Sequence, residues 1–295
     1  GIEQEVFYFA VRGTGFDSEK GVMFSDCYGR ADRLFFMRKE EKVLRELYRS
    51  FDVGSFDLAH AHSLYANGYV ALDLKRKHGI PYIVAVRNSD VSAFLKVRPW
   101  LRDLGVRIML EAERVVFISP AYRSLVLERY VPEQLQAEIA EKSDVIPNGI
   151  SRMFLEHPPI EQPVGNGTIR VIQVGDIDKN KNQLSVARAC ARLVDRGYRV
   201  NFRVVGKRKK ASVARRLSRY SFVELFDPVS QEDLKRMYRE SDVFAMPSLT
   251  ETFGLVYAEA MSQGLPVIYS CKQGFDGWFE DGEVGYAVDS CDVEG

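Results

Sequence analysis

The chain has 295 residues, of which 46% are apolar and 28% are charged, as in ordinary folded proteins. Lys plus Arg number 41 and so do Asp plus Glu, and this balance argues against a nucleic-acid-binding module, which would be basic. A chain of this length has room for two domains with separate cores.

The cysteines and the apolar runs argue against further classes of protein. Cys27, Cys190, Cys271 and Cys291 form no CxxC pair, so neither a disulfide framework nor a zinc site is expected. The first residues lack the pattern of a signal peptide, and no apolar run reaches the ~20 residues that cross a bilayer. We therefore expect a cytoplasmic protein, which could still contact a membrane surface.

The first half of the chain alternates short apolar strands with helices. In chain order we expect a strand at 5–13, a helix at 39–51, a strand at 56–62, a helix at 65–79, strands at 80–87 and 114–119, a helix at 121–130 and a strand at 142–150. Strands that alternate with helices indicate βαβ units and a parallel sheet.

The second half alternates more regularly. In chain order we expect a strand at 169–176, a helix at 181–197, a strand at 198–206, a helix at 210–220, a strand at 221–226, a helix at 231–241 capped by Ser230, a strand at 242–248, a helix at 255–264 and a strand at 265–270. Residues 156–167 lie between the halves and contain three prolines and two glycines, as in an interdomain linker.

The loop at 249–254 leads from a strand into a helix. In an open parallel sheet, ligands bind where strands end and helices begin, because unpaired amides and the helix dipole attract anions. The amides of Phe253, Gly254 and Leu255 would lie at this helix start, and Gly254 has no Cβ that would hold a ligand away. We expect a phosphate-binding turn here.

Glu251 and Glu259 place two carboxylates beside this turn. A carboxylate does not favour a phosphate, but it binds hydroxyl groups, so the pair suits a sugar and a ribose. An acid near the helix dipole and a solvated helix residue would explain the same spacing. Both interpretations stay open on spacing alone.

A second loop, at 174–183, also runs from a strand into a helix. Lys179 and Lys181 lie where an ammonium group could neutralise a diphosphate. Lysines that only solvate a helix start fit the same pattern.

Two expected strands of the first half end in polar side chains. His60 and His62 alternate at the end of one strand, where we expect one ring on each face, and packed or capping histidines explain them as well as a ligand site. Arg87, Asn88 and Asp90 follow the next strand, where they suit either polyol recognition or an Asx turn.

Basic residues gather in two segments. Residues 188–219 contain twelve Lys or Arg and one acid, including the run at 207–210, which fits an anionic partner or a solvated face. Residues 94–110 are basic, apolar and contain a tryptophan, so they could rest on anionic lipid or form an ordinary packed helix.

Together these motifs resemble the retaining glycosyltransferases of the GT-B architecture, in the glycogen-synthase-like family called glycosyl transferases group 1. The resemblance runs from about residue 52 to residue 289 and makes Glu251 and Glu259 the E-x7-E pair of that family. The segments that carry it are 241–268, 174–183, 145–151, 56–63 and 79–86.

This resemblance implies an α/β fold of two Rossmann-like domains with a cleft between them. It predicts an N-terminal acceptor-side domain at 1–156, a linker at 157–167 and a C-terminal nucleotide-sugar-binding domain at 168–295. It also implies that the chain is trimmed at both ends, without the first strand and the closing C-terminal helices of the family.

The resemblance assigns roles to individual residues. Lys181 and the amides of Gly254 and Leu255 would hold the diphosphate, Glu259 the ribose and Glu251 the donor sugar near its anomeric carbon. Lys181 and the helix end would stabilise the leaving phosphate, so that no metal or cofactor is needed. The remaining donor-side residues are Phe253, Gly175, Asp176, Lys179, Gly206, Lys207 and Val223, with backbone around Gly206 and Val223 near the base; the acceptor-side residues are His60, His62 and Arg87.

Two positions depart from the family pattern. Asp176 stands where the family usually has an arginine, so we hypothesise that Lys179, Lys207 or Arg208 compensates for its charge. In the first domain, Arg87 with Asn88 and Asp90 follows the strand that commonly ends in a histidine. We predict that these three residues together replace that histidine in the acceptor or donor-sugar pocket.

The expected function is therefore a metal-independent, retaining hexosyltransferase with a UDP- or GDP-linked sugar as its donor. The acceptor would be a saccharide or a lipid-linked molecule, in surface polysaccharide or glycolipid synthesis, with peripheral contact at the inner membrane face and no nucleic acid as partner. A non-catalytic nucleotide-sugar-binding protein and a GT-B epimerase or phosphorylase stay open as alternatives.

Overall fold

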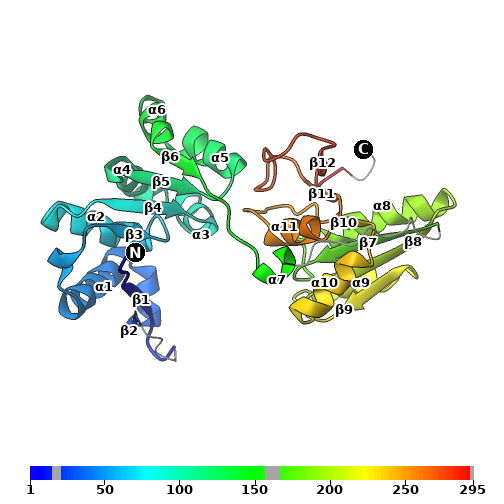
Figure 1. Ribbon diagram of the computed structural model, residues 1–295, viewed down its shortest axis with the longest axis horizontal. Coiled ribbons are helices and arrows are strands. Elements are labelled where there is room, and N and C mark those ends of the chain that lie inside the picture. Colours follow the sequence, from blue (N-terminus) through cyan, green and yellow to red (C-terminus); the bar gives the residue numbers. More distant parts are fainter. Residues whose placement is uncertain (15–20, 157–166, 293–295) are drawn as a thin grey trace. The chain divides into compact units, whose positions relative to one another are not determined.

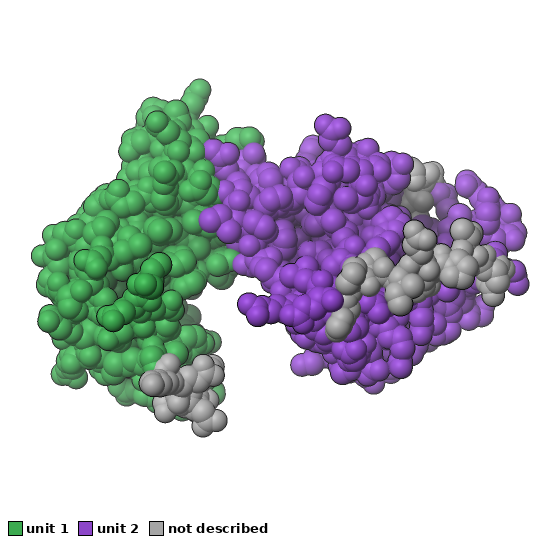
Figure 2. Space-filling model, in the orientation of Figure 1, with its two compact units in different colours: residues 1–117, 126–144 green, residues 118–125, 145–295 purple. Residues whose placement is uncertain are grey.

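The computed structural model describes residues 1–14, 21–156 and 167–292 (Figure 1). The chain divides into two compact units, 1–117 with 126–144 and 118–125 with 145–295, which Figure 2 colours separately. Both units are α/β with parallel sheets, as the sequence predicts. The expected linker lies outside the described residues except for Gly167, and the expected domain boundaries stay predictions.

The second unit contains one six-stranded sheet in the order β12-β11-β10-β7-β8-β9, and every neighbouring pair is parallel. Parallel neighbours require crossover connections, which helices supply except between β11 and β12, where residues 271–284 form turns (Figure 1). The elements are α7 (Arg152–Leu155), β7 (Thr168–Val174), α8 (Gln183–Asp195), β8 (Arg199–Val205), α9 (Ala211–Leu217), β9 (Val223–Phe226), α10 (Gln231–Arg239), β10 (Val243–Ala245), α11 (Leu255–Ser262), β11 (Val267–Ser270) and β12 (Gly285–Val288).

Both faces of this sheet are buried. In β7, Val171 packs into a cluster with Phe202, whereas the adjacent Ile172 packs into a separate cluster with Phe244. Successive side chains of a strand point to opposite faces, so each face has its own core. This explains why apolar residues occupy both faces of the central strands, including adjacent positions such as Val171 and Ile172.

The elements predicted for the second half are confirmed, apart from shifts of a few residues at their ends. Ser230 caps α10 as expected, because its hydroxyl accepts a hydrogen bond from the amide of Asp233 at 3.1 Å. The short strand β12 was not predicted; it adds to the edge of the sheet beside β11.

The first unit contains a four-stranded sheet, β3-β4-β5-β6, and a separate parallel pair, β1-β2. The helices and strands that begin before residue 146 are β1 (Val6–Val11), β2 (Val22–Tyr28), η1 (Arg30–Leu34), α1 (Phe36–Ser50), η2 (Val53–Ser55), β3 (Ala59–Ala61), α2 (Ala66–His78), β4 (Tyr82–Val86), α3 (Asn88–Asp90), η3 (Val91–Leu95), η4 (Pro99–Leu101), α4 (Arg102–Glu111), β5 (Arg114–Phe117), α5 (Pro120–Tyr130), α6 (Glu133–Glu141) and β6 (Ser143–Val145).

Several elements of this half were not predicted or were left open, among them the short helices η1, η2, α3, η3 and η4. Strand β2 and helix α6 were missed, and β2 is hard to detect because Ser25 and Asp26 interrupt its apolar run. Helix α4 lies in the basic segment 94–110 and buries Val106 and Met109, so the packed-helix alternative holds for that part. Within the described ranges, none of the helices combines the length and hydrophobicity needed to cross a bilayer.

Candidate active site

Two glycines end neighbouring central strands of the six-stranded sheet. Gly175 follows β7 and Gly206 follows β8, both with positive φ, and a Cβ on Gly206 would lie 2.1 Å from the carbonyl oxygen of Gly175. Only glycine allows these strand ends to approach so closely. They border a cavity of about 320 Å³ that is also lined by Asp176, Lys207, Lys209, Pro228 and Val229.

Val223 does not line this cavity, and its expected place near the base stays a prediction. It begins β9 and packs into the core on one face of the sheet. The cavity lies at the carboxyl end of β9, where Phe226 is followed by Pro228 and Val229. A strand of this length separates its two ends by roughly 10 Å, so Val223 lies about that far from the end of β9 that borders the cavity.

Asp176 pairs with Lys209, a residue that the sequence did not single out. Lys209 Nζ lies 2.6 Å from Asp176 Oδ2, and this contact raises the pKa of Lys209. Arg208 contacts a different carboxylate, and Lys207 lies at the cavity with its side chain exposed. A run of four basic residues does not indicate which of them faces the acid, so the pattern alone could not identify Lys209.

Lys181 and Glu251 form an ion pair at the same edge of the sheet. The Nζ–Oε2 distance is 2.6 Å, and the side chain of Glu251 is only 10% exposed. Lys181 passes Gly175 closely, because a Cβ on that glycine would lie 3.4 Å from the lysine Cε. The structure therefore brings together the candidate cation and the candidate carboxylate, which the sequence places in separate loops.

The loop that carries Lys181 is joined to the loop that carries Glu251 by hydrogen bonds. The carbonyl of Asn180 accepts from the amide of Leu249 at 2.8 Å, and its side-chain oxygen accepts from the amide of Thr250 at 3.1 Å. Asn180 thus fixes the position of one loop relative to the other. An asparagine in a polar loop gave no signal for this role.

A third loop holds Glu251 from the other side. The amide of Glu251 donates to Gln273 Oε1 at 2.9 Å, and the amide of Gly274 donates to the carbonyl of Glu251 at 2.7 Å. A Cβ on Gly274 would lie 1.8 Å from the carbonyl oxygen of Thr252, so this close approach requires glycine. Gln273 and Gly274 position the site and were not predicted.

Gly254 begins helix α11 in the left-handed conformation, with φ +76°. The first amides of a helix have no partner within it, so those of Leu255 and its neighbours remain available to an anion. Phe253 is buried, and its ring packs edge-on against Trp278 with centroids 6.2 Å apart. The side chain of Phe253 thus anchors the turn, and only its backbone can serve a ligand.

Glu259 lies farther along α11 and is half-buried. Its Oε2 accepts a long hydrogen bond, 3.4 Å, from the hydroxyl of Tyr238, and burial raises the pKa of Glu259.

The described residues contain no cluster of three or more His, Cys, Asp or Glu side chains that could hold a metal.

Asp90 is a structural residue, which corrects its predicted catalytic role. It is 1% exposed, and its carboxylate accepts hydrogen bonds from the amides of Leu64, Tyr65 and Arg87 at 3.0, 3.2 and 2.8 Å. Burial raises the pKa of Asp90, and these amides oppose that rise. Its oxygens therefore hold two strand ends together and do not face a pocket.

The other acceptor-side candidates lie near one another. The rings of His60 and His62 are 4.3 Å apart, so the expectation that they point to opposite faces is wrong: residues two apart on a strand share a face. Arg87 Nε donates to the carbonyl of His62 at 3.4 Å, and Asn88 is exposed at the following turn. Burial, followed by the charges of His62 and Arg87, lowers the pKa of His60.

Two family models match this chain almost from end to end. Glycosyltransferase Family 4 matches residues 2–152, which is more than half of the chain, and Glycosyl transferases group 1 matches residues 160–295. The chain belongs to Glycosyltransferase Family 4, and its second half matches Glycosyl transferases group 1. The resemblance drawn from its motifs is thus confirmed at the level of the family.

The curated relatives are longer than the region that they share with this chain. A D-inositol 3-phosphate glycosyltransferase of Arthrobacter sp. (strain FB24) is 27% identical over 256 residues, which are 80% of this chain and 59% of that protein. The Nocardia farcinica protein of the same name is 27% identical over 272 residues, 84% of this chain and 58% of the relative. The chain thus spans about three fifths of the length of these relatives.

Solved structures establish the GT-B fold. Sucrose-phosphate synthase from Thermosynechococcus elongatus superposes with a TM-score of 0.70 at 18% identity, covering 98% of this chain and 76% of that one. HepE of Anabaena, solved with UDP-glucose, gives 0.64 at 14% identity, covering 97% and 86%. At these identities the likeness concerns the fold alone.

Proposed function

We propose that the protein is a retaining glycosyltransferase that moves a sugar from a UDP- or GDP-linked donor to an acceptor hydroxyl without a metal ion or other cofactor. The observation that carries this proposal is the Lys181–Glu251 pair at strand ends lined by glycine. An ammonium group binds a diphosphate and a carboxylate binds sugar hydroxyls, so the pair suits the two adjacent parts of one nucleotide sugar.

The leaving diphosphate would lie between Lys181 and the amides of Gly254 and Leu255. As phosphate oxygens take the ammonium group of Lys181, the carboxylate of Glu251 is released to accept hydrogen bonds from the donor sugar. The cation and the helix start then stabilise the negative charge that develops on the leaving phosphate, in a site fixed before the reaction. In this scheme the acceptor attacks from the face that the phosphate leaves and gives its proton to the phosphate.

The nucleoside would enter the cavity beyond Gly206. Lys209 is next to that cavity and can exchange Asp176 for a phosphate oxygen, which supplies a second cation. Glu259 has one long hydrogen bond to Tyr238, so a carboxylate oxygen remains able to accept from the ribose.

The acceptor is proposed from the relatives and from the surface. Two of the curated relatives are named for D-inositol 3-phosphate, so it is the first acceptor to test.

We also propose surface glycolipid or polysaccharide synthesis at the inner membrane face, because Val97 and Trp100 are 61% and 72% exposed beside Arg98. Flotation with anionic vesicles, compared with the Trp100→Ala variant, tests this contact; absence of the protein from the vesicle fraction rejects it.

The activity is tested by supplying UDP-, GDP- and ADP-glucose, each with and without acceptor, in the presence of a metal chelator. We expect nucleotide release that depends on acceptor, and a product whose anomeric configuration, read by NMR, equals that of the donor. Binding with neither hydrolysis nor transfer would favour a non-catalytic nucleotide-sugar-binding protein. Donor conversion without acceptor would favour an epimerase, and a requirement for inorganic phosphate a phosphorylase.

A further inference from the structure

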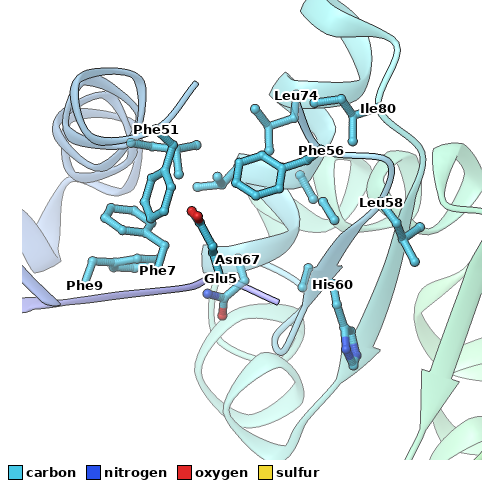
Figure 3. A pocket seen from close by; sticks show the side chains of 15 residues that line it. Glu5, Phe7, Phe9, Phe51, Phe56, Leu58, His60, Asn67, Leu74 and Ile80 are labelled. Carbon is cyan, nitrogen blue, oxygen red and sulfur yellow. The ribbon is translucent and has the colours of Figure 1, made fainter. Parts of the chain in front are cut away.

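Strand β7 of the second unit contains a polar side chain that is completely buried. Gln173 is 0% exposed, although a carboxamide without hydrogen bonds is costly to bury. Polar side chains that line an open cavity, such as Glu5 and Asn67 in the first unit, can bond to water instead (Figure 3). Gln173 has no access to solvent, so its hydrogen bonds depend on groups of the protein.

The carboxamide of Gln173 is only half satisfied, and its partner lies in the loop that carries Lys181. Gln173 Nε2 donates to the carbonyl oxygen of Lys181 at 2.5 Å. Its Oε1 has no hydrogen-bond partner within the described residues. An apolar side chain at this position would avoid the cost of the unpaired oxygen. Packing alone therefore does not explain a glutamine here, whereas its contact with Lys181 does.

The backbone of Lys181 is held on both sides by side chains. Its amide donates to Asp178 Oδ1 at 2.9 Å, and its carbonyl accepts from Gln173. A lysine ammonium group lies at the end of a flexible four-carbon stem, so its position depends on where the backbone holds that stem. In this arrangement Lys181 Nζ lies 2.6 Å from Glu251 Oε2.

We propose that Gln173 is a positioning residue of the donor site, which holds the backbone of Lys181 so that its ammonium group lies where the diphosphate binds. This inference rests on the proposed function, in which Lys181 stabilises the leaving diphosphate. Gln173 is too deeply buried to touch a ligand, so it acts through Lys181 alone. Without its hydrogen bond the loop gains conformations that carry the ammonium group away, and a charge that must first reorganise stabilises a transition state less.

The first residue of α8 offers a matched control. Gln183 is also 0% exposed, donates from Nε2 to a backbone carbonyl of the same loop, that of Asp176, at 2.9 Å, and has an Oε1 without a partner in the described chain. Gln173→Met and Gln183→Met therefore remove the same groups from the same kind of place, but only the first releases Lys181. The two variants should have similar free energies of unfolding.

Steady-state kinetics with a sugar nucleotide and an acceptor then separates the two glutamines. Gln173→Met should lower kcat/KM for transfer by roughly 10–100-fold, with the KM of the acceptor unchanged, and Gln183→Met by no more than about threefold. In the Lys181→Ala background, Gln173→Met should cost less than about twofold, because the cation that it positions is gone. If Gln173→Met does not fold, Gln173→Leu takes its place.

The outcomes distinguish this inference from the function on which it rests. Equal losses for the two glutamine variants, or the same loss for Gln173→Met with and without Lys181, overturn the positioning role while wild-type transfer leaves the proposed function intact. A wild-type protein that transfers no sugar from any donor rejects the proposed function, and the positioning role with it.

Discussion

The two units place polar residues at the ends of parallel strands but use them in opposite ways. In the second unit, Lys181 and Glu251 contact each other at an edge where glycines keep space for a ligand. In the first unit, Asp90 has the same kind of position, yet its carboxylate is occupied by three backbone amides. The difference teaches that a strand-end carboxylate is a candidate for binding only when its partner is one that a ligand can replace.

The largest expected effect is a loss of transfer activity when the charged residues of the donor site in the second unit are removed. Lys181→Ala and Glu251→Ala should each lower kcat/KM for transfer by roughly 10²–10³-fold, because each removes a preorganised charge from the donor site. Lys179→Ala, at an exposed lysine of the same loop that is also a predicted donor-side residue, is compared with them and should lose less activity. Steady-state kinetics on folded protein measures all three. Activity within twofold of wild type for Lys181→Ala would refute the assigned role.

The next effect concerns stability in the first unit. Asp90→Ala should lower the free energy of unfolding by about 2–4 kcal/mol, because three buried amides lose their acceptor. Donor binding to the folded protein should be unchanged. Asn88→Ala, at an exposed position two residues away, should change stability by no more than about 0.5 kcal/mol. Urea unfolding followed by circular dichroism measures the free energy of unfolding of both variants. If Asp90→Ala loses activity while its stability is unchanged, Asp90 becomes a catalytic candidate again.

A buried acid in α1 gives the first unit a pH dependence. Glu40 is fully buried, with one oxygen 2.8 Å from Lys39 Nζ and the other without a partner, and burial raises its pKa from 4.5 to about 7. Between these values the folded state keeps a proton that the unfolded state has lost, so the stability contributed by this group falls as the pH rises from about 4.5 to about 7.

Glu40→Gln should abolish this fall. The variant should match wild type near pH 4, where Glu40 is protonated, and exceed it by about 2–3 kcal/mol at pH 8. The difference in unfolding free energy between the two proteins, measured across this range, isolates Glu40 from the other titrating groups. A difference that stays constant with pH would show that folding does not shift the pKa of Glu40.

The smallest effect concerns Lys209. Its side chain is 60% exposed, so Lys209→Ala should weaken UDP binding only about fivefold, and should weaken UMP binding less. Lys207→Ala is the control from the same basic run. Titration calorimetry with both nucleotides measures this, and equal losses for the two lysine variants would remove the distinction between them.

The sequence was sufficient for the βαβ order of the second unit and for the two loops that carry Lys181 and Glu251. It could not predict their contact, because the residues are 70 positions apart and periodicity carries no tertiary information. The roles of Asn180 and Gln273 depend on which loops meet, so they were missed for the same reason. Asp90 was misassigned because a buried acceptor of amides and a pocket carboxylate have the same sequence pattern.

A crystal structure of the protein with an intact UDP- or GDP-sugar tests the central claim most directly. We predict the diphosphate between Lys181 Nζ and the amides of Gly254 and Leu255, with Glu251 turned from the lysine to the hydroxyls of the sugar. A donor bound elsewhere, or a donor bound while the Lys181–Glu251 pair stays closed, would contradict the account.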